Sequence, residues 1–486
     1  MGIVVYNTLS RQYEEFEPIE EGHVKIYVCG ITPYDSSHIG HARPGVFWDV
    51  VRRYLLYKGY KVTFVTNFTD IEDKIIKRSQ ETGIPFMEIA EKYSREYIDA
   101  MDKLGVKRAD AYPRASEVIP EIIEMVEGLI EKGYAYESSG DVYFRTERFQ
   151  DYGALSGKNL DELMPGARVQ VSGLKESSLD FALWKAADKD EPGWESPWGW
   201  GRPGWHIECS VMVLKFLGPS IDMHGGGTEL IFPHHENEIA QSEAFTGVKP
   251  YVKYWIHHEM LNLSGEKMSK SIGNVLSLTH ILETHDPMAV RLYLLSAHRR
   301  KILEYSEELL QSAEKGWNRI ETCVENATKF LLDPDAQGLS DPTMLIEGIG
   351  KCEKEFFQAM DYDFNTPGAI AAVFDLVTAI NSHIVTTGAT TSDEFGRQKV
   401  GEAYALLIQC LGILGLTPRI LSTLPGTREP QGDDVSQDLL KILVDMRDAA
   451  RKAKDFETAD YIRERLSHLG FVLEDTSSGT KVRIGK

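Results

Sequence analysis

The sequence predicts an α/β protein whose parallel sheet is built in two halves with an insertion between them. Residues 23–30, HVKIYVCG, and 61–68, KVTFVTNF, have strand character, and a helical pattern over 44–57 lies between them. A strand, a helix and a strand in this order form a βαβ unit with parallel strands. The strand pattern resumes at 221–227 and 251–261, which predicts the second half of the same sheet.

The other segments are predicted from their composition and breaks. Pro44 stands at the start of the first helix, where proline is tolerated because first-turn N–H groups have no helical partner. Residues 136–204 hold short strand-like pieces at 141–145 and 168–172 and a Gly/Pro/Trp-rich stretch, which indicates an insertion. A long helical pattern over 306–415 predicts an α-helical bundle.

The composition is that of a globular chain. Of the 486 residues, 42% are hydrophobic and 26% are charged, which excludes a disordered or collagen-like chain. We find no run of about 18 apolar residues and no secretory signal, so we predict no membrane association. The five cysteines are odd in number and widely spaced, which argues against a disulfide framework and predicts a cytoplasmic protein.

The charge is strongly acidic, with 74 acidic and 53 basic residues and a formal net charge of -21. Taken alone, this charge argues against a nucleic-acid partner, because phosphate binding favours a basic surface. The last 50 residues differ, since 437–486 contain ten Lys or Arg and nine Asp or Glu, a net charge of +1. The first 436 residues therefore have a net charge of -22, which is -21 minus +1.

A candidate phosphate-binding loop, GITPYDSSHIGHARPG, follows the first predicted strand. Ser36 and Ser37 can cap the start of a helix, whose free N–H groups attract an anion. Gly40 allows the backbone to approach a ligand closely, and His38 and His41 can donate hydrogen bonds to phosphate oxygens. The alternative is that both are ordinary surface histidines beside a capped helix.

A second polar loop, NLSGEKMSKSIGN at 262–274, carries Lys267 and Lys270. Lysines on a loop that closes over a triphosphate can neutralise the charge that develops on leaving pyrophosphate. Alone, this segment can equally be a solvated surface loop. Together, the strings HIGH at 38–41 and KMSKS at 267–271 resemble the paired signature of the class I aminoacyl-tRNA synthetases.

Four residues form a candidate metal site. Cys29 ends the first strand, and Cys209 lies where the sheet pattern resumes. In FPHHENEIAQSEA (232–244), which we expect to be helical, His234 and Glu238 are i and i+4 and share a face. Two thiolates, an imidazole and a carboxylate can bind zinc. The alternatives are buried free cysteines and a polar helix face.

The sequence resembles the cysteinyl-tRNA synthetases over essentially its whole length. The strings YVCGITPYDSSHIGHAR, TNFTDIEDKII, GRPGWHIECS, HGGGTELIFPHHENEIAQSEA and KMSKSIGN stand where that family has its motifs. The resemblance implies a Rossmann-like class I catalytic domain and ATP-dependent ligation of L-cysteine to tRNA(Cys) through a cysteinyl-adenylate. It also implies that the zinc ligands are Cys29, Cys209, His234 and Glu238.

The resemblance further implies roles for single residues. The catalytic residues are His38, His41, Lys267 and Lys270. The ATP-binding residues are His38, Gly40, His41, Gly225, Gly226, Gly227, Glu229 and Lys270. The cysteine-binding residues are Gly30, Thr32, Thr69, Trp205 and His224, and Asp222 joins the floor of the site. Glu229 stands where we expect Asp more often. The carboxylate is retained, but the side chain is one methylene longer than that of Asp.

We infer that the metal selects the substrate. Cysteine and serine differ little in shape, and shape alone discriminates near-isosteres by only about 10–200-fold. Zinc binds a thiolate strongly and lowers the pKa of a thiol, whereas a hydroxyl is harder and less acidic. One Zn²⁺ per chain would therefore select the thiol without an editing domain, and Mg²⁺ would accompany ATP.

The resemblance also assigns the segments. We expect the first half of the nucleotide-binding domain at 1–120, a connective insertion at 121–204, the second half with the KMSKS loop at 205–305, the bundle at 306–416, a linker at 417–436 and an anticodon-binding module at 437–486. In this family the bundle and the module contact tRNA. Candidate tRNA contacts are Arg299, Arg300, Lys301, Arg451, Lys452, Lys454, Lys481, Arg483 and Lys486. We predict a monomer without an obligate protein partner.

Two other functions stay open from the residues. One is a cysteine:amine ligase of the mycothiol type, which shares the zinc and nucleotide motifs but lacks the terminal module. The other is a catalytically inactive paralogue that binds RNA. The bundle and residues 437–486 argue against the first, and the intact signature residues argue against the second.

Overall fold

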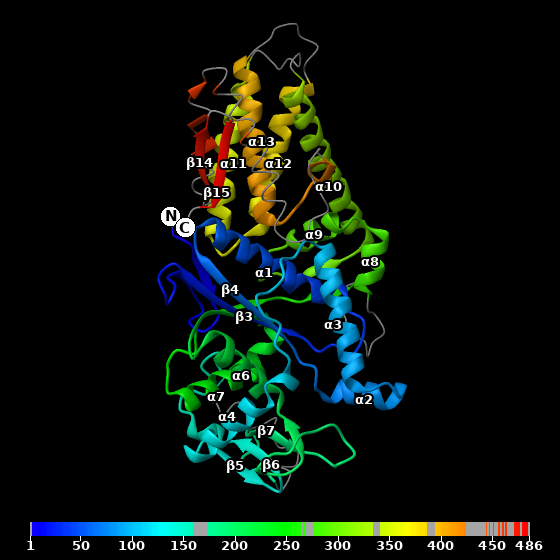
Figure 1. The fold of residues 1–486 in the computed structure, drawn as a ribbon, viewed down its shortest axis with the longest axis vertical. Coiled ribbons are helices and arrows are strands. Elements are labelled where there is room, and N and C mark those ends of the chain that lie inside the picture. The colour runs from blue at the N-terminus through cyan, green and yellow to red at the C-terminus, as the bar shows by residue number, and fades with distance from the viewer. Residues whose placement is uncertain are drawn as a thin grey trace.

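The computed structural model describes most of the chain. The described residues are 2–158, 174–263, 266–267, 276–333, 341–385, 394–423, 471–476 and 479–484, with scattered positions between 444 and 463. The predicted strand at 168–172 and Lys270 of the KMSKS loop lie outside these residues. In Figure 1 the helical bundle stands above a central sheet, and the insertion lies below it.

The central sheet has four parallel strands in the order β10-β9-β3-β4. They are β3 (His23–Ile31), β4 (Lys61–Phe68), β9 (Ile221–Gly227) and β10 (Val252–His258). All four match predicted strands, and the two predicted halves meet where β3 pairs with β9. Strand order reverses at this pair, so a crevice is expected outside the carboxyl ends of β3 and β9.

Helices cover both faces of the sheet. Helix α1 (Ile39–Tyr57) joins β3 to β4 and packs against α9 (Pro287–Leu295), on the side of the bundle. On the other face α6 (Trp205–Leu217) packs against α7 (Glu236–Thr246) and against α4 (Ile119–Glu131). Two apolar cores, one on each face, follow from this arrangement.

Helix α1 begins earlier than the sequence predicts. Its first residue is Ile39, so Pro44 lies inside the helix rather than in its first turn, and His38 rather than Ser36 or Ser37 is the N-cap. Pro44 leaves only the carbonyl of Gly40 without a helical donor, close to the open N-terminal end of the helix, which keeps its cost small.

The insertion is an antiparallel sheet with the order β5-β6-β7-β8. Its strands are β5 (Ala135–Ser138), β6 (Asp141–Phe144), β7 (Phe181–Ala186) and β8 (Gly201–Pro203). The sequence predicts only β6 among them. Strands β7 and β8 were missed because Trp184 and the Gly/Pro pattern around 201–203 do not alternate with polar residues.

The predicted bundle is present. Its helices are α10 (Glu307–Leu332), α11 (Thr343–Asp361), α12 (Thr366–Val385) and α13 (Glu394–Leu414). Helix α12 packs against the other three, and by length and composition its stretch Thr366–Ile384 is apolar enough to cross a membrane. Half of the stretch is buried, as expected of the core helix of a bundle.

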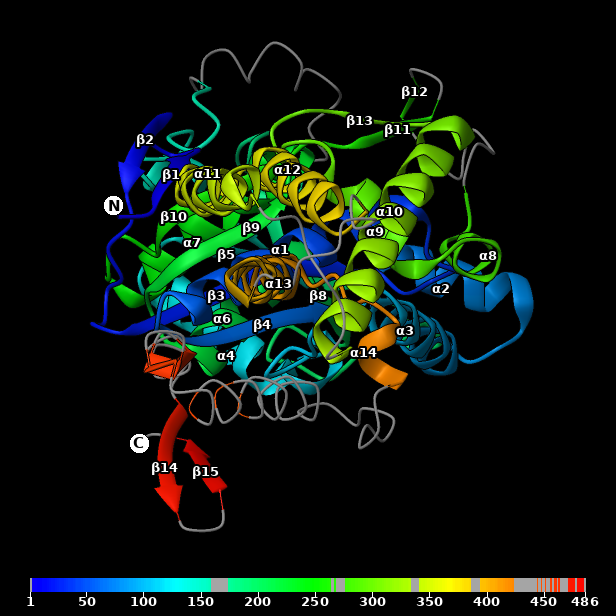
Figure 2. The same ribbon diagram turned by 90° about the horizontal axis from the view of Figure 1, so that it is seen from above.

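Shorter elements connect these parts. They are the hairpin β1 (Val4–Asn7) and β2 (Gln12–Glu15), α2 (Asp73–Thr82), α3 (Phe86–Lys103), β11 (Leu261–Leu263), β12 (Glu266–Lys267), β13 (Leu303–Tyr305), α8 (Leu278–Thr284) and α14 (Ile420–Thr423). Near the C-terminus β14 (Phe471–Thr476) and β15 (Gly479–Ile484) form an antiparallel hairpin. The hairpin projects away from the bundle in Figure 2. The pattern over 448–475 in the predicted anticodon-binding module predicts an amphipathic helix pair, which is wrong for residues 471–475, since they form β14.

Candidate active site and metal centre

A cavity of about 250 Å³ opens at the carboxyl edge of the sheet, where β3 and β9 end. The end of β3, the start of α1, the end of β9 and the segment after β10 line it. Predicted site residues from three motifs therefore meet in one place. Those that line the cavity are Cys29, Gly30, His38, Gly40, His41, Gly226, Gly227 and Glu229.

The two signature histidines stack at the N-terminus of α1. The rings of His38 and His41 have centroids 3.7 Å apart, and the backbone N–H of His38 donates to His41 Nδ1 over 3.3 Å. This bond places the proton of a neutral His41 ring on Nε2, the nitrogen that can then donate to a ligand. Together with the helix N-terminus, the pair forms a site for an anion.

The segment that follows the KMSKS loop is fixed to the HIGH loop by backbone hydrogen bonds. Leu278 N–H donates to Ser37 O over 2.9 Å, and Ile39 N–H donates to Leu276 O over 3.2 Å. Glu96 on α3 adds a side-chain link, since it accepts from Ser36 Oγ at 3.1 Å and from Thr279 Oγ1 at 3.3 Å. On the other side of the loop, Lys267 is the last residue of β12, which pairs with β11.

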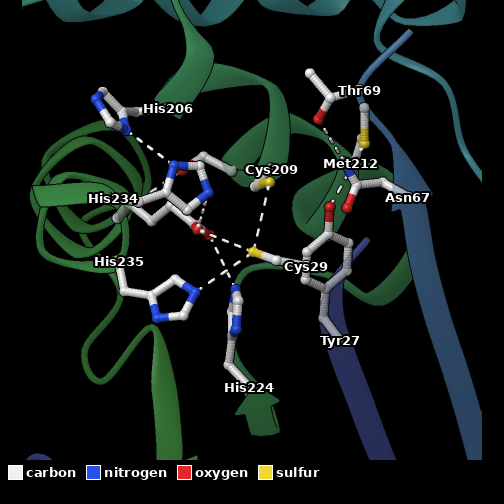
Figure 3. A network of polar contacts seen from close by, with 12 residues as sticks. Tyr27, Cys29, Asn67, Thr69, His206, Cys209, Met212, His224, His234 and His235 are labelled. Atoms are coloured by element: carbon white, nitrogen blue, oxygen red, sulfur yellow. Dashed lines mark hydrogen bonds and ion pairs between the residues drawn. The ribbon is translucent and has the colours of Figure 1, made fainter. Parts of the chain in front are cut away.

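The four predicted metal ligands come together beside this cavity. Ligand atoms of Cys29, Cys209, His234 and Glu238 all lie within 4.8 Å of one another. Figure 3 shows the side chains of Cys29, Cys209 and His234 pointing toward one another. The two sulfurs are 3.9 Å apart, and His234 Nε2 is 3.1 Å from Glu238 Oε1. In a tetrahedral zinc site the corresponding separations are about 3.8 Å and about 3.3 Å, from ordinary zinc–ligand bond lengths. The donor set therefore fits zinc in type and in spacing.

The local helix differs from the one predicted over 232–244. Helix α7 begins at Glu236, and His234 lies in the irregular helical turn Ile231–His235 that precedes it. His234 and Glu238 nevertheless face each other, as the i, i+4 spacing predicts. The site is held at the meeting point of β3, α6 and α7.

Charges in the cluster are distributed unequally. The hydrogen bond from Cys29 lowers the pKa of Cys209 to about 6, whereas burial raises the pKa of Cys29 well above its usual value. Burial alone would lower the pKa of His234, but Cys209 and Glu238 raise it to about 10. Burial likewise opposes ionisation of Glu238, but His224 and His234 lower its pKa to about 2.

Three further histidines surround the four ligands, and the sequence predicted a role for only one of them. His206 Nδ1 lies 2.9 Å from His234 Nδ1, His224 Nε2 lies 3.0 Å from Glu238 Oε2, and His235 Nε2 lies 3.4 Å from Cys29 Sγ. Such contacts orient metal ligands and adjust their basicity. The sequence feature that could have indicated a role for His235 is its position next to His234 in the HHENE string.

His224, His235, Cys29 and Glu238 form a second compact donor set. In both sets the histidine beside the cysteine has its other ring nitrogen engaged, since His235 Nδ1 lies 2.8 Å from His257 Nε2 and His234 Nδ1 lies 2.9 Å from His206 Nδ1. The first set offers two thiolates, the softer donors, so it is the better candidate for zinc, with His224 and His235 in contact with its members.

Of the residues predicted to bind cysteine, Trp205 and His224 contact the four-donor cluster, and Gly30 follows Cys29 directly. Gly30 N–H donates to Asn67 Oδ1 at 2.9 Å, and the Asn67 amide lies 3.3 Å from Thr69 Oγ1. Trp205 is 41% exposed and its ring stacks on His234, with centroids 4.4 Å apart, so it is not an ordinary core aromatic. Thr32 is half-buried in the loop after β3, whereas His224 is fully buried behind Glu238.

Two of the residues predicted for the floor of the site have other surroundings. Asp222 is buried and accepts backbone N–H bonds from Ile19 at 2.6 Å and Lys25 at 2.7 Å, which fixes the N-terminal segment instead. Gly225 packs directly against Trp48, whose ring would lie 2.1 Å from an added Cβ. Gly226 and Gly227 do line the cavity, and the carboxylate of Glu229 lies beside Gly227.

The basic cluster at 299–301 is only partly exposed. Arg299 is 3% exposed and is bonded to Asp363 and to backbone carbonyls, so it cannot contact tRNA as predicted. Arg300 lies over the rings of Tyr6 and Tyr13, and Lys301 is exposed.

Comparison with known proteins identifies the family of the chain. The family described as tRNA synthetases class I (C) catalytic domain matches residues 15–315, and the DALR domain family matches residues 355–417. Two curated relatives, from Caldicellulosiruptor saccharolyticus and Carboxydothermus hydrogenoformans, are each named cysteine–tRNA ligase. Both are 47% identical over 478 residues, which cover 98% of this chain and 99% of the relative.

A solved structure shares the fold. Methionyl-tRNA synthetase of Mycobacterium tuberculosis, in complex with methionyl-adenylate, superposes with a TM-score of 0.60 over 87% of this chain and 94% of that chain, at 16% sequence identity. The match to the catalytic-domain family, the two relatives that match over nearly their full length and the shared fold all indicate the same family. The chain belongs to the cysteine–tRNA ligase family of class I aminoacyl-tRNA synthetases.

Proposed function

We propose that the chain joins L-cysteine to tRNA(Cys) in two steps with a cysteinyl-adenylate as the intermediate. The overall reaction, ATP-dependent ligation of cysteine to tRNA, is that of the family. The observation that carries the two-step proposal is the position of the four-donor cluster at the end of β3, beside the cavity lined by His38, His41 and Gly226. A thiol held at this cluster and a nucleotide held in the cavity would be neighbours.

In the first step a carboxylate oxygen of cysteine attacks the α-phosphorus of ATP, and the bond from that phosphorus to the bridging oxygen of pyrophosphate breaks. In the second step a hydroxyl of the terminal tRNA ribose loses its proton and attacks the carbonyl carbon, and AMP leaves. Both steps need positioning and charge stabilisation more than covalent help from the protein.

The roles of the nucleotide residues follow from their positions. His38 and His41 donate to phosphate oxygens at the N-terminus of α1, while Gly40, Gly226 and Gly227 leave room for the nucleotide. Glu229 is exposed at the rim of the same cavity, where its carboxylate can reach a ribose. The roles of Lys267 and Lys270 rest on the KMSKS motif instead: they stabilise the charge on pyrophosphate, and Mg²⁺ accompanies ATP.

The roles of the amino-acid residues follow in the same way. Cys29, Cys209, His234 and Glu238 hold zinc, which when bound supplies a soft Lewis acid that favours a thiolate over a hydroxyl. Trp205 covers the side chain of cysteine, and Thr32, Thr69 and Gly30 orient its polar ends. His224 contributes by fixing the Glu238 carboxylate.

The remaining parts of the chain complete the proposal. The bundle and the terminal module contact tRNA, with the module at the anticodon. The chain acts as a monomer in the cytoplasm and needs no other protein.

A pair of assays tests this function. We expect cysteine-dependent ATP–pyrophosphate exchange, and transfer of labelled cysteine to tRNA(Cys), with no comparable transfer of serine. Exchange without transfer to tRNA would instead indicate a ligase of the mycothiol type. Neither activity, with tRNA binding retained, would indicate an inactive RNA-binding paralogue.

A further inference from the structure

A buried carboxylate lies at the corner where α11 turns into α12. Asp363 is 0% exposed, and Asp363 and Phe364 both have positive φ values, 58° and 51°. Two consecutive non-glycine residues in the left-handed region persist only where surrounding contacts hold them. The corner is therefore held by its surrounding contacts.

The contacts of Asp363 lead into the catalytic domain. Its Oδ1 atom lies 2.5 Å from an Arg299 guanidinium nitrogen and accepts from Tyr6 N–H at 2.9 Å, while its own N–H donates to Val4 O at 2.8 Å. His298 and Arg300 lie 3.3 Å and 3.5 Å from Oδ2. Asp363 lies in the range that matches the DALR domain family, and Arg299 lies in the range that matches the catalytic domain family. The ion pair therefore joins the two domains.

Arg299 continues this connection to the active-site strand. One guanidinium nitrogen donates to His257 O at 2.6 Å, and the backbone carbonyl of Arg299 accepts from Glu259 N–H at 2.7 Å. His257 is the penultimate residue of β10, and Glu259 lines the cavity. The end of β10 is therefore bonded to the same residue that binds the bundle corner.

The HIGH helix is attached to the same segment. Arg43 of α1 is buried and donates to the carbonyls of Glu259 and Met260 at 2.7 Å, and to those of His298 and Lys301 at 3.2 Å and 2.6 Å. The segment 298–301 is consequently bonded to α1, to the strand end that borders the cavity, and through Arg299 to the bundle.

From this geometry we propose that Arg299 and Asp363 are positioning residues that fix the orientation of the bundle relative to the active site, so that a tRNA bound to the bundle presents its end to the adenylate. The proposal rests on the proposed function, since it assigns tRNA binding to the bundle. Formation of the adenylate needs only the sheet and its loops. Transfer to tRNA also needs the bundle to have the correct orientation relative to the cavity.

The test separates the two half-reactions in Asp363→Asn and Arg299→Lys. We expect the kcat/KM of ATP–pyrophosphate exchange to stay within about threefold of the parent, because neither residue lines the cavity. We expect the rate of single-turnover transfer from the adenylate to tRNA to fall tenfold or more, with the KM for tRNA unchanged. Arg299→Lys keeps the charge but not the planar fork, so it should retain more transfer than Arg299→Met.

A matched control is Asp375→Asn, which breaks an exposed ion pair with Lys351 on the same two bundle helices. It should leave both half-reactions unchanged. A parallel loss of exchange and transfer in the Asp363 and Arg299 variants, tracking a lower melting temperature, would overturn the proposal, as would unchanged transfer. Absence of exchange in the parent chain would instead refute the proposed function itself.

Discussion

At the scale of single residues, the metal ligands are the part of the site that the sequence predicts best. Cys29, Cys209, His234 and Glu238 meet as expected because strand ends and an i, i+4 pair restrict where their side chains can point. Among the histidines around them, His206 was missed because it approaches His234 only through tertiary packing, and His235 was missed although it is adjacent to His234 in the sequence. The role of Lys270 stays a prediction, since it lies outside the described residues.

Replacement of Cys209 by Ser tests the selecting role of the metal. A hydroxyl is a far weaker zinc ligand than a thiolate, so zinc content should fall below one per chain and the preference for cysteine over serine should fall at least tenfold. Metal analysis and ATP–pyrophosphate exchange with each amino acid measure both quantities. Loss of zinc with unchanged selectivity would contradict selection by the metal.

Gly30→Ala tests the close approach of β3 to β4 at the cavity. An added Cβ would lie 1.7 Å from the carbonyl oxygen of Asn67, so the strand end that carries Cys29 must move. We expect exchange activity to fall at least a hundredfold, since a displacement of about 1 Å in an active site has this effect. Gly350→Ala in α11, where the described residues leave open space around the added methyl group, is the control and should be as active as the parent.

At the scale of elements, the four strands of the central sheet were predicted more accurately than the start of α1. The strands β3, β4, β9 and β10 lie where strand segments were predicted, and most of their residues are buried. The start of α1 was placed too late because Pro44 was taken as a first-turn residue. Pro44 lies six residues into the helix, where its missing N–H deprives the carbonyl of Gly40, in the first turn, of its helical donor.

Glu96→Ala tests the link between the HIGH loop and α8. The variant removes two hydrogen bonds, to Ser36 and Thr279, each worth about 1 kcal/mol, so the geometry of the phosphate site should loosen. We expect the kcat of exchange to fall about 5- to 30-fold. The KM for cysteine should stay unchanged, because the thiol site lies on the other side of β3. An increase in that KM with normal kcat would count against this role of Glu96.

At the scale of the whole molecule, the net charge of -21 was the least informative property. It argued against a nucleic-acid partner, yet the chain belongs to a tRNA ligase family. RNA is recognised through shape, splayed bases and 2′-hydroxyls as well as charge, so a few well-placed cations suffice. The order of domains was predictable from pattern, whereas their boundaries stay predictions.

A buried ion pair between α1 and α9 links stability to pH. Burial opposes ionisation of Asp49, but Arg291 at 2.5 Å and Arg53 at 2.7 Å lower its pKa below the usual value. A carboxyl whose folded pKa is depressed stabilises the fold above its unfolded pKa of about 3.9, and this contribution is lost as the pH falls through the folded pKa.

Asp49→Asn should therefore lower the melting temperature at pH 7, with a loss of stability of about 3–5 kcal/mol because Arg291 keeps a buried charge without a counterion. The difference from the parent should persist down to about pH 5 and shrink below about pH 4. Differential scanning calorimetry across this range measures it. A difference that is the same at pH 3 and pH 7 would contradict the ionised role of Asp49.

The pairing of β3 with β9 also has a consequence for synthesis of the chain. The insertion lies between the two strands, and Glu238 follows Cys29 by 209 positions (238 minus 29) in the chain. At about 5–20 residues per second, the ribosome needs about 10–40 s to reach Glu238 from Cys29. The first partner of the Cys29 thiol, Cys209, is added only 180 positions after it, and the set is complete only at Glu238. The central strand pair and the metal site are therefore late products of folding, completed only after the insertion has emerged.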